Sequence, residues 1–402
     1  MEMYDHFIVA PSSWEEDGLK FRRHRLVEYL TNRSDTNCIY WIYPISVHNK
    51  NQLQKYKKEN KNYIKINGIK VHLISFLDLK GFIKNQSFIF NNDKNKINNI
   101  LRHSIHKKKL WFTHPAYAKL IELYDWDSVI YDCSDLWARP YLSRLRSIKF
   151  LETYRSKTIM SSELEIITNS DRVITTSEYL AEHVYNLARV NAIVIENGVE
   201  YELFENTIVS SETLKEFENI PKPRIGFVGG LKHKINFRLL IDLAKNIESG
   251  SIVLAGPIPK TRPDDLDELL TMGNVYYLGP LQPTKVPEYI KEFQIGLLPY
   301  TSIEYNMAVS PLKLFEYLAC GVQAIGCGIP GTTKYNEENI YRYALESEFV
   351  DACNSILEVN SSEKLIDKRK LTAKKHDWFE KFELFFKLSN ENKGTRGENT
   401  IE

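Results

Sequence analysis

The sequence predicts an α/β protein with two Rossmann-like, doubly wound domains facing a central cleft. Three observations lead to this prediction. Short apolar runs on consecutive positions recur along the 402 residues, as in parallel strands that are buried on both faces. Segments with helical periodicity separate these runs in both halves of the chain. A break in this alternation at residues 219–223, which include two prolines, divides the two halves.

The expected strands alternate with helical segments along the whole chain. In the first half they cover residues 6–11, 37–44, 71–76, 109–115, 128–135, 172–178 and 192–198. In the second half they cover residues 224–230, 251–257, 275–280, 295–300 and 322–328. Residues 237–247 show the helical pattern between strands, since their leucines fall on one face. We therefore expect domains at 1–210 and 211–388, followed by a disordered polar tail at 389–402.

The composition excludes several classes of protein. The chain is 43% hydrophobic and 26% charged, which is too apolar for an intrinsically disordered protein. The formal net charge of +1 gives no overall argument for a nucleic-acid partner. The five cysteines form no CxxC pair, so we expect reduced thiols in a cytoplasmic protein. Neither a signal peptide nor an apolar run long enough to span a bilayer is expected from the sequence.

Positive charge is concentrated in residues 50–109. This segment holds fifteen Lys and Arg against three Asp and Glu, with apolar pieces between the lysines. Such a mixture suits the anionic inner face of a cell membrane, where each nearby cation contributes about 1 kcal/mol. The alternative interpretation is an ordinary solvated surface in a lysine-rich chain. No zinc-finger spacing or RNP-type aromatic motif accompanies the lysines, so we expect no nucleic-acid partner.

In doubly wound sheets, ligands bind beyond the carboxyl ends of the strands. In the first half, His114, Asp132 and Asp135 stand at or near such ends. In the second half, the glycines at 229 and 230 follow a predicted strand. Two such domains facing each other would bring both sets of strand ends to one cleft. We therefore look for the chemistry at these positions.

Residues 306–326 contain the most informative helix. Ser310 suits the N-cap, Pro311 suits the first helical position, and Gly321 suits the position just after the helix. The exposed N–H groups at such a helix start can bind a phosphate. Glu316, in the second turn, can accept both hydroxyls of a ribose, and Lys313 lies one turn before it. The alternative is an ordinary capped helix with an ion pair between these two side chains.

The segment VGGLKHKINF, residues 228–237, supports a phosphate site. Gly229 and Gly230 allow a close approach to the backbone, and Lys234 can neutralise a diphosphate. Asn236 suits the N-cap of the following helix. The segment matches neither GxGxxG nor GxxxxGK[ST], which disfavours a dinucleotide site and a P-loop. A glycine turn with surface lysines remains the alternative.

The chain resembles a known family of proteins. The runs IGFVGG (225–230), SIVLAGP (251–257) and SPLKLFEYLACGVQAIG (310–326) resemble the carboxyl domain of GT-B, glycogen-synthase-like (group 1) glycosyltransferases. The runs YDCSDLW (131–137) and VIENGVEYELF (194–204) are similar to enzymes of teichuronic-acid and cell-surface polysaccharide synthesis. The resemblance covers about residues 5–385.

The resemblance implies transfer of a sugar from a nucleotide-diphosphate sugar, most simply a UDP-sugar, to a glycan. It implies no cofactor and no bound metal. By this analogy Lys234 balances the charge of the leaving diphosphate, a large electrostatic contribution, and Glu316 holds the donor ribose. The donor-binding residues that it implies are Gly229, Gly230, Lys234, Ser310, Pro311, Leu312, Lys313 and Glu316.

The chain departs from the family pattern at three positions. Many relatives have a glutamate eight residues before the one at 316, where this chain has Ala308. Gly230 stands where an arginine is common, and Asn236 where an aspartate is common. These differences put in doubt a direct transfer of the retaining mechanism.

The candidates on the acceptor side are His114, Asp132 and Asp135. A carboxylate at a strand end could deprotonate an acceptor hydroxyl in an inverting displacement. Alternatively His114 could hydrogen-bond a sugar hydroxyl in a retaining reaction. Non-catalytic roles are equally open, since Asp135 could cap a helix and His114 could be a turn residue before Pro115.

Together these observations predict a glycosyltransferase of bacterial cell-surface polysaccharide synthesis. We expect a lipid-linked glycan acceptor and a cytoplasmic enzyme that is peripheral on the inner face of the cell membrane. Two alternatives stay open from the sequence. One is a nucleotide-sugar 2-epimerase on the same scaffold, and the other is a degenerate protein that only binds a nucleotide sugar.

Overall fold

In a computed structural model the chain divides into two compact units. The structure describes residues 2–14, 20–46, 63–78, 89–139, 149–359 and 362–391. The first unit comprises Met1–Glu196 together with Phe382–Glu402, and the second comprises Asn197–Lys381. These ranges differ from the division expected at residue 210. Residues 197–210 belong to the second unit because Tyr201 and Phe204 are buried in its core.

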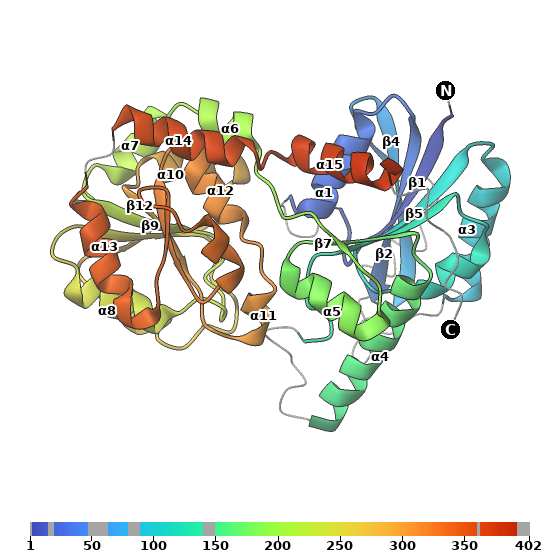
Figure 1. Ribbon diagram of the computed structural model, residues 1–402, viewed down its shortest axis with the longest axis horizontal. Coiled ribbons are helices and arrows are strands. Elements are labelled where there is room, and N and C mark those ends of the chain that lie inside the picture. Colours follow the sequence, from blue (N-terminus) through green and yellow to red (C-terminus); the bar gives the residue numbers. More distant parts are fainter. Residues whose placement is uncertain are drawn as a thin grey trace. The chain divides into compact units, whose positions relative to one another are not determined.

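The first unit is built on one sheet (Figure 1). Among its described residues, eight strands are joined in the order β3-β4-β2-β1-β5-β6-β7-β8, and all neighbours are parallel except β3 and β4. The strands are β1 Tyr4–Val9, β2 Thr36–Ser46, β3 Tyr63–Ile66, β4 Ile69–Asp78, β5 Lys107–Phe112, β6 Ser128–Cys133, β7 Arg172–Thr175 and β8 Ile193–Val194. Phe7, Ile8 and Val9 are fully buried, which explains the continuous apolar run of β1.

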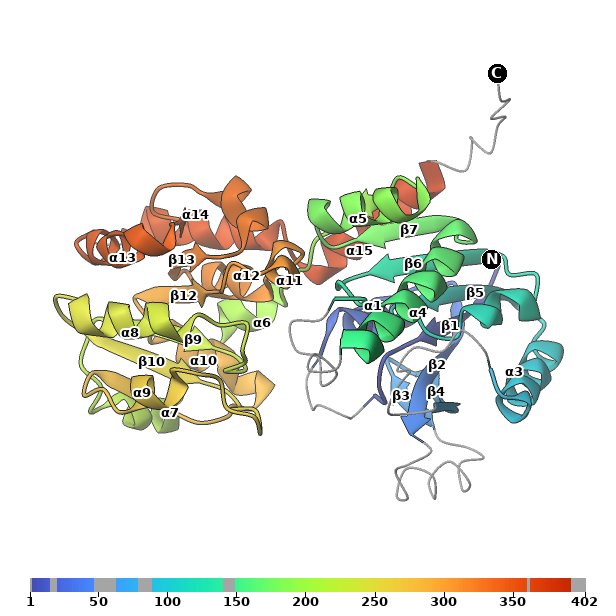
Figure 2. The same cartoon turned by 90° about the horizontal axis from the view of Figure 1, so that it is seen from below.

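Helices cover both faces of this sheet (Figure 2). They are α1 Arg22–Thr31, α3 Asn91–His103, η1 Ala118–Leu123, α4 Lys149–Thr168, α5 Glu178–Ala188 and α15 Trp378–Glu391. Aromatic side chains join α15 to the rest of the unit: Phe385 meets Trp111 on β5, and Phe382 and Phe386 meet Tyr29 on α1. The last helix therefore completes the core of the first unit. Residues 389–391 of the predicted disordered tail belong to α15, and residues 392–402 lie outside the described residues.

The second unit has a parallel sheet in the order β11-β10-β9-β12-β13-β14, six strands within the described residues. The strands are β9 Arg224–Val228, β10 Ser251–Ala255, β11 Val275–Tyr277, β12 Ile295–Pro299, β13 Gln323–Cys327 and β14 Tyr341–Tyr343. β9, β10, β12 and β13 are buried along their whole length. This is the burial expected when helices pack on both faces of a parallel sheet.

In the second unit α8 and α13 lie on one face of the sheet, and α6, α10, α12 and α14 lie on the other (Figure 1). The helices are α6 Tyr201–Asn206, α7 Ser211–Phe217, α8 Phe237–Asn246, α9 Leu266–Leu270, α10 Val286–Lys291, α11 Glu304–Met307, α12 Leu312–Ala319, α13 Phe349–Leu357 and α14 Glu363–Lys374. Short 3-10 turns are η2 Pro283–Lys285, η3 Pro330–Tyr335 and η4 Glu346–Glu348.

Each segment predicted as a strand overlaps one in the structure. The fold class, two α/β units with largely parallel sheets, is confirmed. The sequence prediction missed β3 and β14, which are four and three residues long and lie at sheet edges. Residues of β3 alternate between exposed and half-buried positions, so they lack the continuous apolar run by which the other strands were found.

Candidate active site

The glycine turn after β9 lies against the first turn of α12. A Cβ atom added to Gly229 would lie 2.2 Å from Cε of Lys313, so the lysine side chain occupies the space beside the glycine. Gly229 also has φ of +149°, which L-residues with a side chain rarely adopt. The loop and the helix start, 84 residues apart in the sequence, are therefore neighbours. The structure brings together two segments that the sequence indicated separately.

The glycine turn also needs Gly256, which follows β10. A Cβ atom there would lie 2.1 Å from the carbonyl oxygen of Gly229, and φ of Gly256 is +142°. The N–H of Gly229 donates to the carbonyl of Ala255 at 2.7 Å, and the N–H of Leu231 donates to Pro257 at 3.0 Å. The turn therefore lies directly on the end of β10. Gly230 differs, since a Cβ there would meet only the flexible side chain of Lys232 at 3.0 Å.

Lys234 has a fixed backbone position beside two tyrosines. Its carbonyl accepts hydrogen bonds from the N–H of Thr301 at 3.1 Å and from the side-chain amide of Asn306 at 3.1 Å. Its Nζ lies 5.5 Å from the ring centroid of Tyr300 and 5.8 Å from that of Tyr305. The ammonium group is thus held on the carboxyl side of β12, as expected for a strand-end site. Asn236 caps α8, as predicted, by accepting the N–H of Leu239 at 2.9 Å.

The predicted start of α12 was wrong by one residue. The helix begins at Leu312, and Pro311 is its N-cap residue, with an extended ψ of 115° and no side-chain capping bond. Ser310 does not cap the helix, because its Oγ accepts the N–H of Asn197 at 3.1 Å and its carbonyl accepts the Asn197 amide at 2.8 Å. The N–H groups of the first turn therefore lack a serine cap of their own helix.

The end of α12 is as predicted. Gly321 has φ of +77°, and its N–H donates to Leu318 at 2.9 Å while that of Val322 donates to Tyr317 at 2.9 Å. This pair of bonds is a Schellman motif. Tyr317 in the middle of the helix is fully buried, and its hydroxyl donates to the carbonyl of Leu297 at 3.1 Å. The helix is thereby fixed against β12.

Glu316 is half-buried on the second turn of α12. Its charge acts on Tyr300, whose pKa is raised well above its usual range, first by burial and then by the Glu316 carboxylate. The Lys234 ammonium thus lies near the ring of Tyr300, and the Glu316 carboxylate helps to raise the pKa of that tyrosine. The structure gathers Gly229, Lys234, Lys313 and Glu316 around the carboxyl ends of β9 and β12 in one unit. Ala308 is buried at the end of α11.

In the first unit, His114 and Asp135 follow the carboxyl ends of β5 and β6, which are neighbours in the sheet. His114 is buried, and the ring of Trp137 meets it edge-on with the centroids 4.5 Å apart. The carbonyl of Asp135 accepts the N–H of Trp137 at 3.0 Å. Asp135 caps no helix among the residues that the structure describes. These two candidates therefore lie at the same edge of the sheet.

Asp132 has a different environment from Asp135. Both of its carboxylate oxygens lie 2.9 Å from Nε of Arg22 on α1, and the two side chains are 3% and 6% exposed. Arg22 also donates to the carbonyl of Glu196 at 3.1 Å. The structure thus places Asp132 in a buried ion pair that joins β6 to α1.

Sequence reasoning missed Asn306, and it placed Asn197 only at a strand end without a role. Asn306 is fully buried and holds the carbonyls of Lys234 and Thr301, the latter at 2.7 Å. Asn197 fixes Ser310 from a segment 113 residues away. Both act on the backbone of the candidate site, so no residue pattern near them distinguishes them from surface asparagines.

The described residues offer neither a metal-binding cluster nor a membrane-spanning helix. No group of three or more His, Cys, Asp or Glu side chains that could hold a metal ion was found in that part of the chain. Nor does any helix in those ranges have the length and apolar character needed to cross a membrane. All five cysteines are free thiols.

Known proteins are similar to this chain in sequence and in fold. Residues 222–359 match the model of the family described as glycosyl transferases group 1. The chain is 33% identical over 388 residues to TuaH of Bacillus subtilis (strain 168), described as a candidate glycosyltransferase of teichuronic acid biosynthesis. The match covers 93% of this chain and 94% of that protein.

Solved structures resemble the chain over almost its whole length. Sucrose-phosphate synthase from Thermosynechococcus elongatus superposes with a TM-score of 0.68 at 14% identity, covering 96% of this chain and 98% of that one. HepE of Anabaena, solved in complex with UDP, superposes with a TM-score of 0.67 at 13% identity, covering 97% and 100%. At these identities the likeness concerns the fold.

Proposed function

Because this chain belongs to the group 1 glycosyltransferases and has their GT-B fold, we propose that its second unit binds the diphosphate of a UDP-sugar. The chain transfers a sugar from a nucleotide-sugar donor in the synthesis of a cell-surface polysaccharide. HepE, which shares the fold, binds UDP, and this supports uridine as the base of the donor.

The contact between Gly229 and Lys313 carries the assignment of the diphosphate site. The missing side chain at Gly229 lets the Lys313 side chain lie against the backbone, and the N–H groups of the first turn of α12 favour an anion. Lys313, at that first turn, adds a positive charge next to the glycine. The diphosphate would lie between this loop and Leu312, with Pro311 and Gly230 beside it.

Lys234 and Glu316 have complementary roles in this proposal. The ammonium of Lys234 stabilises the negative charge that develops on the departing diphosphate, where a preorganised charge lowers the barrier most. Its carbonyl is fixed by Thr301 and Asn306, so the side chain starts from a rigid backbone. The Glu316 carboxylate accepts the hydroxyls of the ribose. Ser310 contributes through the Asn197 contact, which positions the segment before α12.

On the acceptor side, Asp135 or His114 is the group that meets the acceptor hydroxyl. Both follow strand ends at one edge of the first sheet. Asp132 is a weaker candidate for a general base, because its carboxylate is engaged by Arg22 and buried. The acceptor itself would be a lipid-linked glycan, reached at the inner face of the cell membrane. Residues 63–78 and 89–109 of the basic segment would contribute positive charge there.

The other two functions are not favoured. A 2-epimerase or an inactive binding protein would be an exception among relatives that are described as glycosyltransferases. Turnover separates these possibilities, since only a transferase forms a glycosidic product with an added acceptor.

The first experiment is a thermal-shift series with UDP, GDP, TDP, ADP and CMP. A ligand that binds only the folded state raises the melting temperature in proportion to ln(1 + [L]/Kd). We expect UDP to give the largest shift, and Lys234→Ala to reduce it more than Lys232→Ala does. Lys232 is exposed and two residues away, so it controls for a general loss of charge. Equal shifts for all nucleotides, or none, would contradict the proposed donor site.

A further inference from the structure

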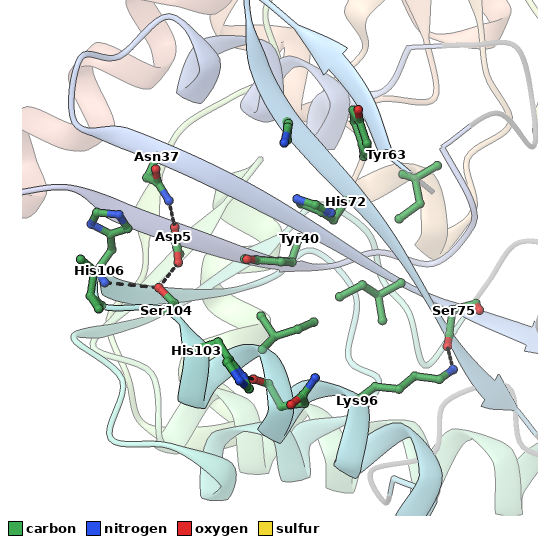
Figure 3. Close-up of a pocket in the computed structure, with 16 residues that line it drawn as sticks. Asp5, Asn37, Tyr40, Tyr63, His72, Ser75, Lys96, His103, Ser104 and His106 are labelled. Carbon is green, nitrogen blue, oxygen red and sulfur yellow. Dashed lines mark hydrogen bonds between the residues drawn. The ribbon is translucent and has the colours of Figure 1, made fainter. Parts of the chain in front are cut away.

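A second candidate binding site lies in the first unit, at the opposite side of its sheet from the strand ends that carry His114 and Asp135. A cavity of about 900 Å³, here called the α3 groove, opens between helix α3 and the sheet (Figure 3). Asp5, Asn37 and Lys70, which line it, are each the second residue of their strands. The proposed acceptor residues follow the opposite ends of the strands. A six-residue strand such as β5 is about 20 Å long, so these are separate places.

One wall of the α3 groove is a row of stacked rings. Tyr63, His72 and Tyr40 are register partners on β3, β4 and β2, so they stand side by side across the sheet. The His72 and Tyr40 rings are 5.2 Å apart and 19° from parallel, and Tyr63 tilts against His72 at 5.7 Å. Rings stacked along the sheet present their edges, which carry partial positive charge, to the space above.

The polar groups of this row are neutral hydrogen-bonding groups. The pKa of His72 is lowered, first by burial and then by the charge of Lys70, so its imidazole stays neutral at pH 7 and can both donate and accept. Burial raises the pKa of Tyr40 well above its usual range, so its hydroxyl stays protonated. These groups, with the amide of Asn99 on α3, suit a ligand that has several hydroxyls.

Positive charge is added by lysines at both sides of the groove. Lys70 is exposed at the rim, with Nζ 5.3 Å from the ring centroid of Tyr63. Lys96 lies on the α3 wall, where it donates to the carbonyl of Ser75 at 3.3 Å (Figure 3) and forms an ion pair with the buried Asp93 at 3.1 Å. The one carboxylate in the lining, Asp5, is buried and accepts hydrogen bonds from Asn37 at 2.7 Å and from Ser104. Its charge is therefore partly compensated within the wall.

Size and chemistry together indicate the class of ligand. A volume of about 900 Å³ is in the range of sites for whole organic ligands and far exceeds the needs of one phosphate ion. Neutral donors and acceptors in a row match hydroxyl groups, and the exposed Lys70 at the rim matches an acidic group. We propose that the α3 groove binds a sugar that carries a carboxylate or a phosphate, as part of the glycan that the enzyme extends. The identification of this glycan as the enzyme's own acceptor rests on the proposed function.

Binding at a place separate from the acceptor residues of the same unit would hold a growing chain to the enzyme between transfers. A second attachment point raises the effective concentration of the chain end at the reaction site without any new contact there. The positive charge of residues 63–78 and 89–109 would thereby serve a specific ligand as well as the membrane surface.

The test uses the full chain and four defined probes, measured by isothermal titration. They are a hyaluronan tetrasaccharide, which alternates uronate and neutral sugars, glucose 1-phosphate, maltotetraose as the neutral control, and phosphatidylglycerol vesicles. We expect the tetrasaccharide or the sugar phosphate to bind more tightly than maltotetraose. Which of the two binds more tightly distinguishes a carboxylate from a phosphate as the acidic group.

Two variants and a control locate the binding. Lys70→Gln and Tyr63→Ala change exposed side chains, so both proteins should fold, and each should weaken binding about fivefold. Lys94→Gln removes the same charge from an exposed position on α3 outside the lining and should leave the affinity unchanged. Equal binding of maltotetraose, no saccharide binding, or vesicle binding lost in the same variants would each overturn the inference. If UDP still raises the melting temperature, only this inference fails and the proposed function stands.

Discussion

Arg22 and Asp132 form a buried ion pair that joins α1 to the end of β6. Nε of the arginine lies 2.9 Å from both carboxylate oxygens, and the exposed fractions of the two side chains are 6% and 3%. Two charges removed from water at this depth stabilise the fold only while both partners are present. The aspartate that the sequence suggested as a catalytic base is thus one partner of a buried ion pair.

This relationship predicts the effect of Asp132→Asn. The change leaves the Arg22 guanidinium buried without its counter-charge, so we expect the free energy of unfolding to fall by about 3 kcal/mol. Urea unfolding of the purified variant measures this loss. A double variant, Arg22→Met with Asp132→Leu, should recover much of the stability because apolar side chains replace both charges. Loss of turnover at unchanged stability would instead identify Asp132 as the base.

Alanine substitutions at the glycines of the donor loop should differ in their effect on stability. Gly256→Ala places a Cβ 2.1 Å from the carbonyl oxygen of Gly229 at a φ of +142°, so we expect a loss of about 2–3 kcal/mol in stability. Gly230→Ala meets only the flexible end of Lys232, and its stability should change by less than about 0.5 kcal/mol. Chemical denaturation of both variants compares them. Equal stabilities would show that the loop tolerates a side chain at Gly256.

Gly229→Ala tests the loop in another way. Its Cβ would overlap Cε of Lys313, so the lysine must leave its place beside the glycine. We expect the affinity for UDP to fall about tenfold, which corresponds to about 1.4 kcal/mol. The melting temperature of the variant without ligand controls for a loss of folding. If the Gly229→Ala protein binds UDP as tightly as the wild type, the diphosphate does not bind at this position.

Glu316→Gln keeps the size of the side chain and removes its charge. A charged acceptor of two ribose hydroxyls contributes about 1.5–3 kcal/mol, so we expect the Kd for UDP to rise at least tenfold. Calorimetric titration with UDP gives the affinity, and the melting temperature without ligand reports on the fold. Glu338→Gln, at an exposed position of the same unit, is the matched control. An unchanged Kd with a lowered melting temperature would make Glu316 a structural residue.

The sequence was sufficient for the fold because its strands are buried on both faces. β9 and β13, for example, are buried at every position, and such runs have no polar alternation to obscure them. β3 was missed because its four residues alternate and form an antiparallel pair at a sheet edge. Local patterns thus predict buried strands well and short edge strands poorly.

The candidate site could be predicted only where its chemistry is local. Asn236 caps α8 through a residue three positions away, so the cap followed from the sequence. Ser310 has an equally suitable sequence, yet its hydroxyl accepts the N–H of Asn197, and this contact depends on the tertiary fold. The proximity of Gly229 and Lys313 is likewise a property of the fold. Which residues meet across such distances cannot be derived from spacing.

His376 predicts how the stability of the protein changes with pH. Its ring stacks on Phe315 with the centroids 3.8 Å apart, and Tyr335 meets it edge-on. Burial, and then the charges of nearby lysines, lower its pKa to about 3 from 6.5. The unfolded chain therefore binds a proton below pH 6.5 that the folded chain does not bind until about pH 3. Its contribution to stability is present above pH 6.5 and is lost as the pH falls toward 3.

Between pH 7 and pH 5 this one histidine should account for about 2 kcal/mol of lost stability. His376→Phe keeps an aromatic ring on Phe315 and has no proton to bind, so its stability should fall less over the same interval. Urea unfolding of the wild type and the variant at both pH values measures the difference. The histidines at positions 6 and 24, whose pKa values burial also lowers, titrate equally in both proteins and cancel in the comparison. Parallel losses in the two proteins would mean that His376 is protonated in the folded state at pH 5.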